Sequence, residues 1–200
     1  MDDSIELGCA LSRADFDAMA RMEAGFYGED LITPAEEAWH WYVAHPFTTY
    51  AARCRNGRIA GFVNLFPVHD QVYRAILAGA FNDADLVAPD VVDPFGEEGT
   101  AGIARPLNML LSCVVVAREW QDTGLAYRLL SGAAAQFAGA ARPIASVAID
   151  TATPDGARLA LKLGFSPVGP TDHGTHVWQT SWQDFTSRLN GRQSFKGKLG

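Results

Sequence analysis

The chain has 200 residues, of which 48% are hydrophobic and 20% charged, and its formal net charge is -7. This length and composition suit one globular domain with a sizeable core, and they exclude neither an enzyme nor a binding module. The acidic balance argues against a nucleic-acid-binding protein, although it leaves room for a local site that holds phosphates.

The sequence opens with MDDSIELG, an acidic stretch without the pattern of a signal peptide. No apolar run approaches the roughly 18 residues that a membrane-spanning helix needs. We therefore expect a cytoplasmic protein without a membrane or nucleic-acid partner. The cysteines Cys9, Cys54 and Cys113 lack the spacing of metal ligands, so we expect no metal and interpret Cys113 as a small buried side chain.

The first third of the chain predicts a short strand and two helices. The strand is IELGCAL, and the first helix begins after Ser12. The second helix has Thr33 as a candidate N-cap and Pro34 at its first position. It should end before Pro46, because the residue preceding a proline avoids helical geometry.

A β-hairpin and a long irregular segment come next. Two β-prone runs flank Asn56-Gly57, a dipeptide that readily takes the positive φ angles of a tight turn. Residues 67–106 form an insertion in which VHDQVYRAILAGAF favours a helix. The rest of this insertion is rich in Pro, Gly and acidic residues and is predicted to be a long loop.

The second half of the chain alternates between strands and helices. LNMLLSCVVV is a nearly continuous apolar run, typical of a strand that is covered on both faces. After it, a helix presents one apolar face made of Leu125, Leu129, Leu130, Ala133, Ala134 and Phe137. The strand ASVAID and a helix capped by Thr153 and stopped by Gly164 follow, and FSPVG and HVWQTSW are the last predicted strands.

This order of elements predicts an α/β (α+β) fold with a mixed, mostly antiparallel central sheet and helices on both of its faces. We expect residues 1–185 to form a single domain. Residues 186–200 are basic and contain glycines, and they are expected to form a flexible tail.

The junction AREWQDTGLAYRLL places Gln121, Gly124 and Ala126 where a strand runs into a helix. The first N–H groups of a helix lack partners within it, and together with the helix dipole they favour an anion such as a diphosphate. A glycine there lets the backbone approach a ligand closely. Many strand–helix turns carry a glycine for steric reasons only, so the motif alone is weak.

Further residues raise the significance of this motif. Gln121-x-x-Gly124-x-Ala126 after a hydrophobic strand resembles the central motif of the GNAT acyltransferase superfamily. RLALKLGFSPVG is similar to that family's Lys-x-Gly-Phe stretch, and GRIAGFVNLF resembles its second and third strands. The resemblance covers roughly residues 50–66 and 107–182, in the correct order. It implies the GNAT fold and the transfer of an acetyl or other acyl group from acyl-CoA to an amine.

The resemblance also implies where acetyl-CoA, or another acyl-CoA, would bind. The backbone of the strand would hold the pantetheine arm and the thioester, the turn would hold the diphosphate, and Thr153 would add a hydrogen bond. The implied cofactor-binding residues are Val114, Val115, Val116, Gln121, Asp122, Thr123, Gly124, Leu125, Ala126, Tyr127 and Thr153. The acceptor would be the amine of a small molecule, attacking the thioester directly. A homodimer is possible.

The chain departs from the family at the usual general acid. The family often places a Tyr just before the Lys-x-Gly-Phe stretch, where this chain has Ala160. The candidates for the missing acid or base are Glu97, Glu98 and Tyr73, each of which also fits a surface role. The alternative function is therefore a catalytically reduced acyl-CoA-binding sensor or interaction domain on the same scaffold.

Two further patterns leave alternatives open. Trp39, Trp41, Tyr42 and Phe47 are too many aromatic side chains for one core-facing stripe, and they fit either an acceptor pocket or ordinary packing and a dimer contact. The stretch DHGTH invites a metal site, but its spacing favours a turn.

Overall fold

The structure is a computed structural model that describes residues 4–27, 32–96 and 105–196. Its core is a seven-stranded sheet in the order β1-β2-β3-β4-β5-β7-β6. The strands are β1 (Ile5–Leu7), β2 (Thr49–Cys54), β3 (Ile59–Val68), β4 (Leu107–Val116), β5 (Ile144–Thr151), β6 (Ser166–Pro170) and β7 (His176–Ser181). All neighbouring pairs are antiparallel except β4 and β5, which confirms the predicted mixed, mostly antiparallel sheet.

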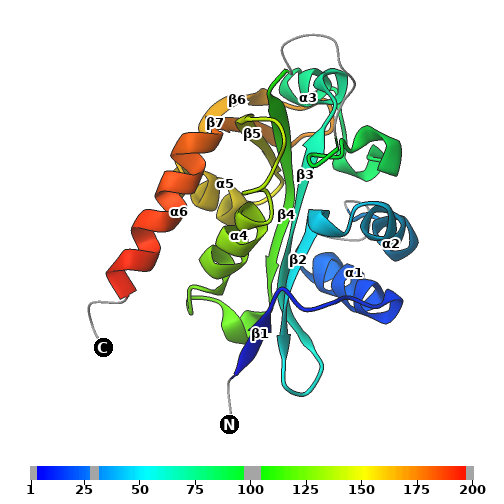
Figure 1. The fold of residues 1–200 in the computed structure, drawn as a ribbon, viewed down its shortest axis with the longest axis vertical. Helices are drawn as coiled ribbons and strands as arrows, with labels where there is room; N and C mark the ends of the chain where they lie inside the picture. The colour runs from blue at the N-terminus through cyan, green and yellow to red at the C-terminus, as the bar shows by residue number, and fades with distance from the viewer. Residues whose placement is uncertain (1–3, 28–31, 97–104, 197–200) are drawn as a thin grey trace.

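Helices cover both faces of the sheet, as predicted. They are α1 (Arg13–Tyr27), α2 (Ala35–Ala44), α3 (Asp70–Leu77), α4 (Leu125–Ala135), α5 (Pro154–Lys162) and α6 (Trp182–Lys196). Figure 1 shows α1, α2 and α3 on one face and α4, α5 and α6 on the other. The sheet is therefore the middle of three layers, and any ligand that reaches both faces must pass between strands.

The start of α1 follows from its capping residues. The carboxylate oxygen Oδ2 of Asp15 accepts hydrogen bonds from the backbone N–H and the hydroxyl of Ser12, each at 2.7 Å. This is one half of a capping box, and it satisfies groups that the helix itself cannot. Phe16 and Met19 then bury one face of the helix, with 2% and 3% of their surface exposed.

The predicted N-cap of α2 is wrong. The helix begins at Ala35 with Pro34 as its N-cap, and no side chain caps it. Pro34 has ψ 137°, an extended value, so the helix starts one residue later than expected and Thr33 lies outside it. The end of α2 agrees with the prediction, because the last helical residue is Ala44 and Pro46 begins a separate 3-10 turn.

The aromatic residues of α2 pack within the protein, as the ordinary-packing interpretation expects. Trp41 is 1% exposed, and its indole N–H donates to the carbonyl of Leu86 at 2.9 Å. Trp39 lies edge-on to Phe16, with 5.5 Å between the ring centres. These contacts connect α2 to α1 and to the segment after α3.

The β2–β3 hairpin forms at the predicted dipeptide. Gly57 has a φ of +85°, while the side chain of Asn56 accepts a hydrogen bond from the N–H of Arg58 at 3.1 Å. The N–H of Cys54 closes the turn by donating to the carbonyl of Arg58 at 2.8 Å. Only the glycine of this dipeptide needs the left-handed conformation.

The insertion before β4 contains the predicted helix, α3, followed by two short 3-10 turns, η3 (Asp83–Asp85) and η4 (Ala88–Asp90). The segment after them is tied to β3, since the N–H of Val92 donates to the carbonyl of Pro67 at 2.8 Å. The loop prediction therefore holds only between short ordered turns. Residues 97–104 lie outside the described residues.

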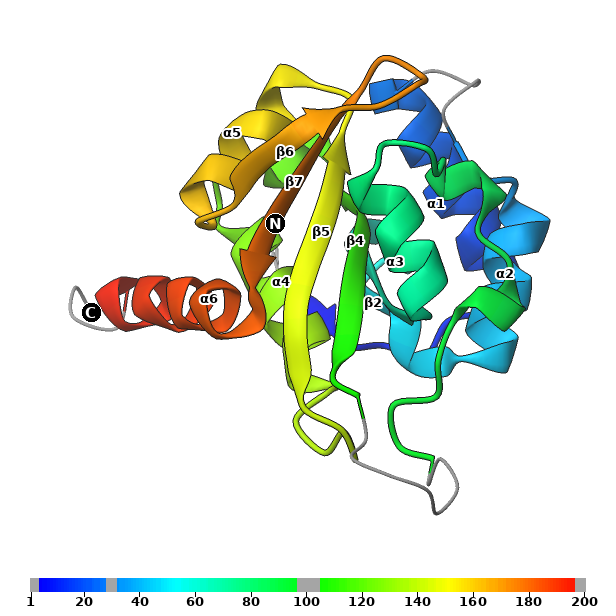
Figure 2. The ribbon, with the colours of Figure 1, turned by 90° about the horizontal axis from the view of Figure 1, so that it is seen from above.

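The end of the chain differs from the expected tail. Residues 186–196 belong to α6, in which Phe185 and Leu189 are 0% and 2% exposed. Their spacing of four residues puts both on the face that packs against the core, and this was missed because glycine and basic residues dominate the composition there. Figure 2 shows α6 extending beyond the edge of the sheet. Within the described ranges, no helix is both long and apolar enough to cross a membrane.

Candidate functional site

Strands β4 and β5 separate halfway along their length. Their parallel ladder runs from Leu107, opposite Ile144, to Leu111, opposite Ile149, and then stops. Beyond this point β4 continues to Val116 against β3, and β5 continues to Thr151 against β7. The edge of residues 112–116 that faces β5 therefore has no partner strand. Such a split in a central sheet leaves backbone hydrogen-bonding groups for a ligand.

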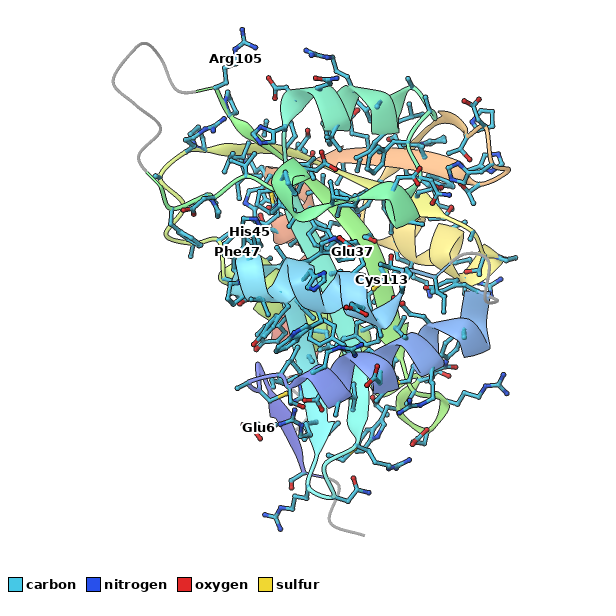
Figure 3. The ribbon with its side chains drawn as sticks, turned by 90° about the vertical axis from the view of Figure 1, so that its right-hand side faces the viewer. Glu6, Glu37, His45, Phe47, Arg105 and Cys113 are labelled. Carbon is cyan, nitrogen blue, oxygen red and sulfur yellow. The ribbon has the colours of Figure 1, made fainter. Side chains whose placement is uncertain are left out.

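A bulge in β4 lies at the start of the split. Asn64 of β3 pairs with Cys113 and the next residue, Leu65, pairs with Leu111, which leaves Ser112 as an extra residue. Beyond the bulge, the side chain of Cys113 packs with the α1 side of the core and that of Val114 packs with the α4 side. Figure 3 views the α1 face of the sheet and labels Cys113.

A cavity of about 110 Å³ occupies the split. Ser112, Cys113 and Val114 line it from β4, and Ile149, Asp150 and Thr151 line it from β5. Its remaining lining comes from both faces of the sheet: Glu23, Tyr27, Thr33, Asn82, Asp83, Ala84, His173 and Thr175 on one side and Ala152, Thr153, Gly156 and Leu159 near α5 on the other. The cavity thus connects the two faces through the gap between the strands.

Glu23 is a carboxyl group whose protonation changes near neutral pH. It projects from the last turns of α1 and accepts a hydrogen bond from the thiol of Cys113. Burial raises the pKa of Glu23 from its ordinary value of 4.5 to about 7, and the bond from Cys113 opposes the rise. A carboxyl group with such a pKa is suited to accept a proton from a substrate at neutral pH.

Two proton donors lie beside Glu23. Burial, followed by the adjacent carboxyl of Glu23, raises the pKa of the Cys113 thiol well above its ordinary value. Burial also raises the pKa of Tyr27, and the neighbouring Cys113 and Glu23 add to the rise. Both groups therefore remain protonated at neutral pH. This agrees with the interpretation of Cys113 as a buried side chain and not a nucleophile, since the nucleophilic form of cysteine is the thiolate.

Asp83 in η3 is a second carboxyl group with a raised pKa. Burial raises its pKa from 3.8 to about 7, and the negative charges of Asp150 and Glu23 add to the rise. A hydrogen bond with Ser112 and the proximity of His173 act in the opposite direction. The mutual influence of these groups shows that Glu23, Asp83 and Asp150 share one electrostatic environment.

Asp150 is held in place by the loop between β6 and β7. Its Oδ2 accepts from the hydroxyl of Thr175 at 2.5 Å and lies 3.0 Å from Nε2 of His173. The other oxygen, Oδ1, is buried and has no hydrogen-bond partner among the residues that the structure describes. The stretch DHGTH thus forms a turn that leads into β7, as expected, and the first of its two histidines, His173, lines the cavity. No group of three metal-ligating side chains occurs within the described ranges.

The raised pKa of Asp83 predicts that the stability of the protein depends on pH. The folded state binds more protons than the unfolded chain between pH 3.8 and about 7, so the free energy of unfolding falls as the pH rises through this window. The substitution Asp83→Asn removes the charge. It should increase the free energy of unfolding by about 1 to 2 kcal/mol near pH 8, which is less than the full shift implies because the side chain is half-buried.

Urea unfolding of D83N and the unsubstituted protein, measured near pH 4 and near pH 8, checks this prediction. The matched control is Asp85→Asn, in the same 3-10 turn but exposed, which should change stability little at either pH. A lower free energy of unfolding for D83N near pH 8 would contradict the prediction, because it would show that the charged carboxylate does not destabilise the folded state.

The turn between β4 and α4 has the geometry of an anion-binding site. Asp122 has a φ of +61° and Gly124 a φ of +83°, so two left-handed residues shape the turn just before the helix. Such backbone forms a concavity of N–H groups. The first hydrogen bond that enters α4 joins the N–H of Arg128 to the carbonyl of Gly124 at 3.2 Å, and the N–H groups of the first helical turn therefore precede the helical ladder.

Gln121 connects this turn to the split strand. Its side-chain amide donates to the carbonyl of Val116 at 3.3 Å, at the end of β4. The turn and the unpaired part of β4 are therefore contiguous, as the sequence motif implied. Of the implied cofactor-binding residues, Val114 and Thr153 line the cavity, and the turn lies at the end of the same strand.

The residue at the family's usual acid position does not line the cavity. Ala160 is 0% exposed and packs in the core with α4 and α6, whereas Gly156 and Leu159 are the residues of α5 that line the cavity. None of these three side chains can donate a proton. Thr153 caps α5 as predicted by accepting from the N–H of Gly156 at 3.1 Å.

Of the predicted acid and base candidates, the structure describes only Tyr73, and Tyr73 does not line the cavity. Tyr73 is 4% exposed, and its hydroxyl lies 2.7 Å from Ser146 Oγ and accepts from Gln179 at 3.1 Å, in a network away from the lining residues. Glu97 and Glu98 lie outside the described residues. The aromatic residues Trp39, Trp41, Tyr42 and Phe47 are likewise absent from the described lining, so the aromatic acceptor pocket is not supported.

Glu23, Tyr27, Asp83 and Asp150 line the cavity but were missed in the sequence, whereas Cys113 and the DHGTH stretch with His173 were considered there for other roles. One signal was available for Glu23, because it lies seven residues after Phe16 and four after Met19. Residues at these spacings share one helix face, so a carboxylate followed the buried stripe of α1. Asp83, Asp150 and His173 carry no comparable local pattern.

Comparison with known proteins rests on structure alone, because no family model and no curated protein matches the sequence. The chain is similar to PaiA N-acetyltransferase from Thermoplasma acidophilum in complex with coenzyme A, with 13% identity and a TM-score of 0.57, over 90% of this chain and 99% of that one. A putative acetyltransferase of the GNAT family from Desulfovibrio desulfuricans is 12% identical, with a TM-score of 0.55 over 89% and 99% of the two chains. This protein has the GNAT fold.

A third similar structure contains a bisubstrate analogue. Naa20 from Chaetomium thermophilum, solved with a bisubstrate analogue, is 14% identical, with a TM-score of 0.57 over 92% of this chain and 90% of that one. The GNAT fold of the present chain therefore agrees with the sequence resemblance. A shared fold does not determine the substrate, which depends on the residues that line the cavity.

Proposed function

We propose that this protein is a member of the GNAT superfamily that transfers an acyl group, acetyl in the simplest case, from acyl-CoA to an amine. The observation that carries the proposal is the cavity in the split between β4 and β5, because carboxyl groups with pKa values near 7 line it on the side of α1 and η3. The unpaired part of β4 leads from this cavity to Val116, and the turn and helix terminus suited to a diphosphate follow that end of the strand.

The donor would enter from the side of α4 and α5. The turn before α4 supports this, because two left-handed residues, Asp122 and Gly124, directly precede the N-terminus of the helix, where an anion is favoured. The unpaired edge of Val114 to Val116 would then receive the amide groups of the pantetheine arm, in the manner of an added strand. A backbone N–H of this edge would stabilise negative charge on the thioester oxygen during attack.

The acceptor would enter from the side of α1 and η3, with Glu23 as the general base. Glu23 contacts Cys113, the neighbour of the cavity-lining Val114, and its pKa of about 7 lets it take a proton from an ammonium group. The neutral amine then attacks the thioester carbonyl carbon, and the carbon–sulfur bond breaks. The small cavity, about 110 Å³, supports a slender amine of a small molecule over a bulky acceptor.

Tyr27 would give its proton to the departing thiolate, and its phenolate would then take the second proton, which the acylated nitrogen releases. Tyr27 lines the same cavity, and its raised pKa keeps the phenol protonated at neutral pH. The proton donor would therefore come from α1, because the α5 side chains that line the cavity cannot donate a proton. No metal ion is needed for any step of this reaction.

The first experiment is a calorimetric titration with coenzyme A and acetyl-CoA, followed by an acetyl-transfer assay with a panel of amines. We expect both coenzyme A and acetyl-CoA to bind. Release of the free thiol of coenzyme A should depend on an added amine, and mass spectrometry should detect the acetylated amine. Absence of coenzyme A binding would overturn the proposal. Tight binding without transfer to any amine would instead favour the acyl-CoA-binding sensor or interaction domain.

A further inference from the structure

The acceptor side of the cavity carries an excess of negative charge. Glu23, Asp83 and Asp150 line it from α1, η3 and β5, and the charges of Glu23 and Asp150 raise the pKa of Asp83. The only basic side chain in the described lining is that of His173, and no lysine or arginine is part of it. An acceptor with a carboxylate of its own would be repelled here, whereas additional positive charge would be attracted.

Asp150 has the features of a residue arranged for a ligand. Its side chain is 12% exposed, and Thr175 and His173 fix one of its two oxygens from the β6–β7 loop. The other oxygen has no donor among the described residues, although a buried carboxylate normally has its hydrogen-bonding capacity satisfied. The missing donor can be supplied by a ligand in the cavity that Asp150 lines.

Glu23 and Asp150 line the cavity between the strands from different elements. Glu23 lies beside Cys113 on β4, where the proposed function puts the reacting amine, while Asp150 lies on β5 across the split. One carboxyl group, on α1, therefore lies beside β4, and the other is part of β5, and the charges of both raise the pKa of Asp83.

Resting on the proposed function, we infer that the acceptor is a diamine: one ammonium group is deprotonated and acylated beside Glu23, and Asp150 binds the second, non-reacting ammonium group. Thr175 and His173 are positioning residues that hold the carboxylate of Asp150. The acyl group goes to a single nitrogen, and the second nitrogen keeps its proton and its charge throughout.

The test compares three acceptors of equal chain length that differ only at the far end: 1,4-diaminobutane, n-butylamine and 4-aminobutanoate. With acetyl-CoA and the unsubstituted protein, kcat/KM for the diamine should exceed that for butylamine by about tenfold or more, as expected for a hydrogen bond between charged groups. The amino acid should be the poorest acceptor of the three.

The variant Asp150→Asn removes the charge and keeps the shape. It should lower kcat/KM for diaminobutane, mainly through KM, by a factor about tenfold larger than the factor by which it changes kcat/KM for butylamine. The matched control is Asp155→Asn on α5, whose carboxylate is 84% exposed and lies outside the described lining. Circular dichroism and the affinity for coenzyme A verify that each variant is folded.

Equal kcat/KM values for the diamine and butylamine, or an equal loss for both in D150N, would overturn the inference while leaving acyl transfer to amines intact. If no amine is acylated, the binding of the three compounds to the coenzyme A complex is measured by calorimetry. Lack of preference for diaminobutane would then also overturn the inference. Preferential binding of the diamine without any transfer would support the charge selection and contradict the proposed function.

Discussion

Glu23→Gln is expected to lower kcat for acyl transfer by about 100-fold or more, the usual range for loss of a general base. The amide retains the size of the side chain and its place beside Cys113, but it cannot accept the proton of an ammonium group. The affinity for acetyl-CoA should remain within about twofold, because no part of the diphosphate turn changes. Steady-state kinetics and calorimetry separate these two quantities.

The pH profile gives this prediction a second readout. In the unsubstituted protein, kcat/KM should rise with pH through about 7 as Glu23 ionises, with Asp83 titrating in the same range. E23Q should lose part of this rise. The control is Asp17→Asn on the same helix, where the carboxylate is 47% exposed and pairs with Arg13. Retention of more than half of the activity by E23Q would remove Glu23 from the mechanism.

Gly124→Ala is expected to weaken coenzyme A binding by about tenfold or more, since a left-handed backbone costs an alanine roughly 1 to 2 kcal/mol and its methyl group would stand where the ligand approaches. Gly124 has a φ of +83° at the N-terminus of α4, where the diphosphate is proposed to lie. Calorimetry with coenzyme A gives the dissociation constant directly.

The protein contains a matched control for this change. Gly57 has a φ of +85° in the β2–β3 hairpin, with no atom within 4 Å of an added Cβ, so Gly57→Ala imposes the same backbone strain far from the site. It should lower stability without changing the affinity. S-acetylpantetheine, which lacks the diphosphate, should bind equally well to G124A and the unsubstituted protein. Equal weakening of both ligands would locate the effect elsewhere than at a diphosphate.

The fold could be predicted largely because its signals are local. The Asn56-Gly57 turn, the Thr153 cap and the Gly164 stop each depend on a few adjacent residues, and all three occur where expected. The apolar run of β4 and the periodic face of α4 are similarly short-range patterns. Errors arose where neighbours decided the outcome, as at Thr33, which lies two residues before the first residue of α2, and at α6, where Phe185 and Leu189 are buried against distant elements.

The candidate site could be predicted only in the part that is continuous in the chain. Residues 114–127 are consecutive and comprise the end of β4, a short 3-10 helix at Arg118–Trp120, the turn and the start of α4, so their proximity follows from order alone. Glu23, Asp83, Asp150 and His173 come from separate elements and meet only because the ladder between β4 and β5 stops at Leu111. The place where two strands diverge has no signature in either strand, and burial that raises a pKa is likewise a property of the assembled protein.

The early end of that ladder has a mechanical consequence. The sheet consists of two antiparallel blocks, β1 to β4 and β5 to β7, which are joined edge to edge only over residues 107–111 and 144–149. This seam is shorter than the ladder between β3 and β4, and a molecule lying in the gap would hold the two blocks together beyond it. Binding of a ligand in the gap and association of the two blocks are then thermodynamically linked. Above the dissociation constant, the free energy of unfolding grows with the logarithm of the ligand concentration.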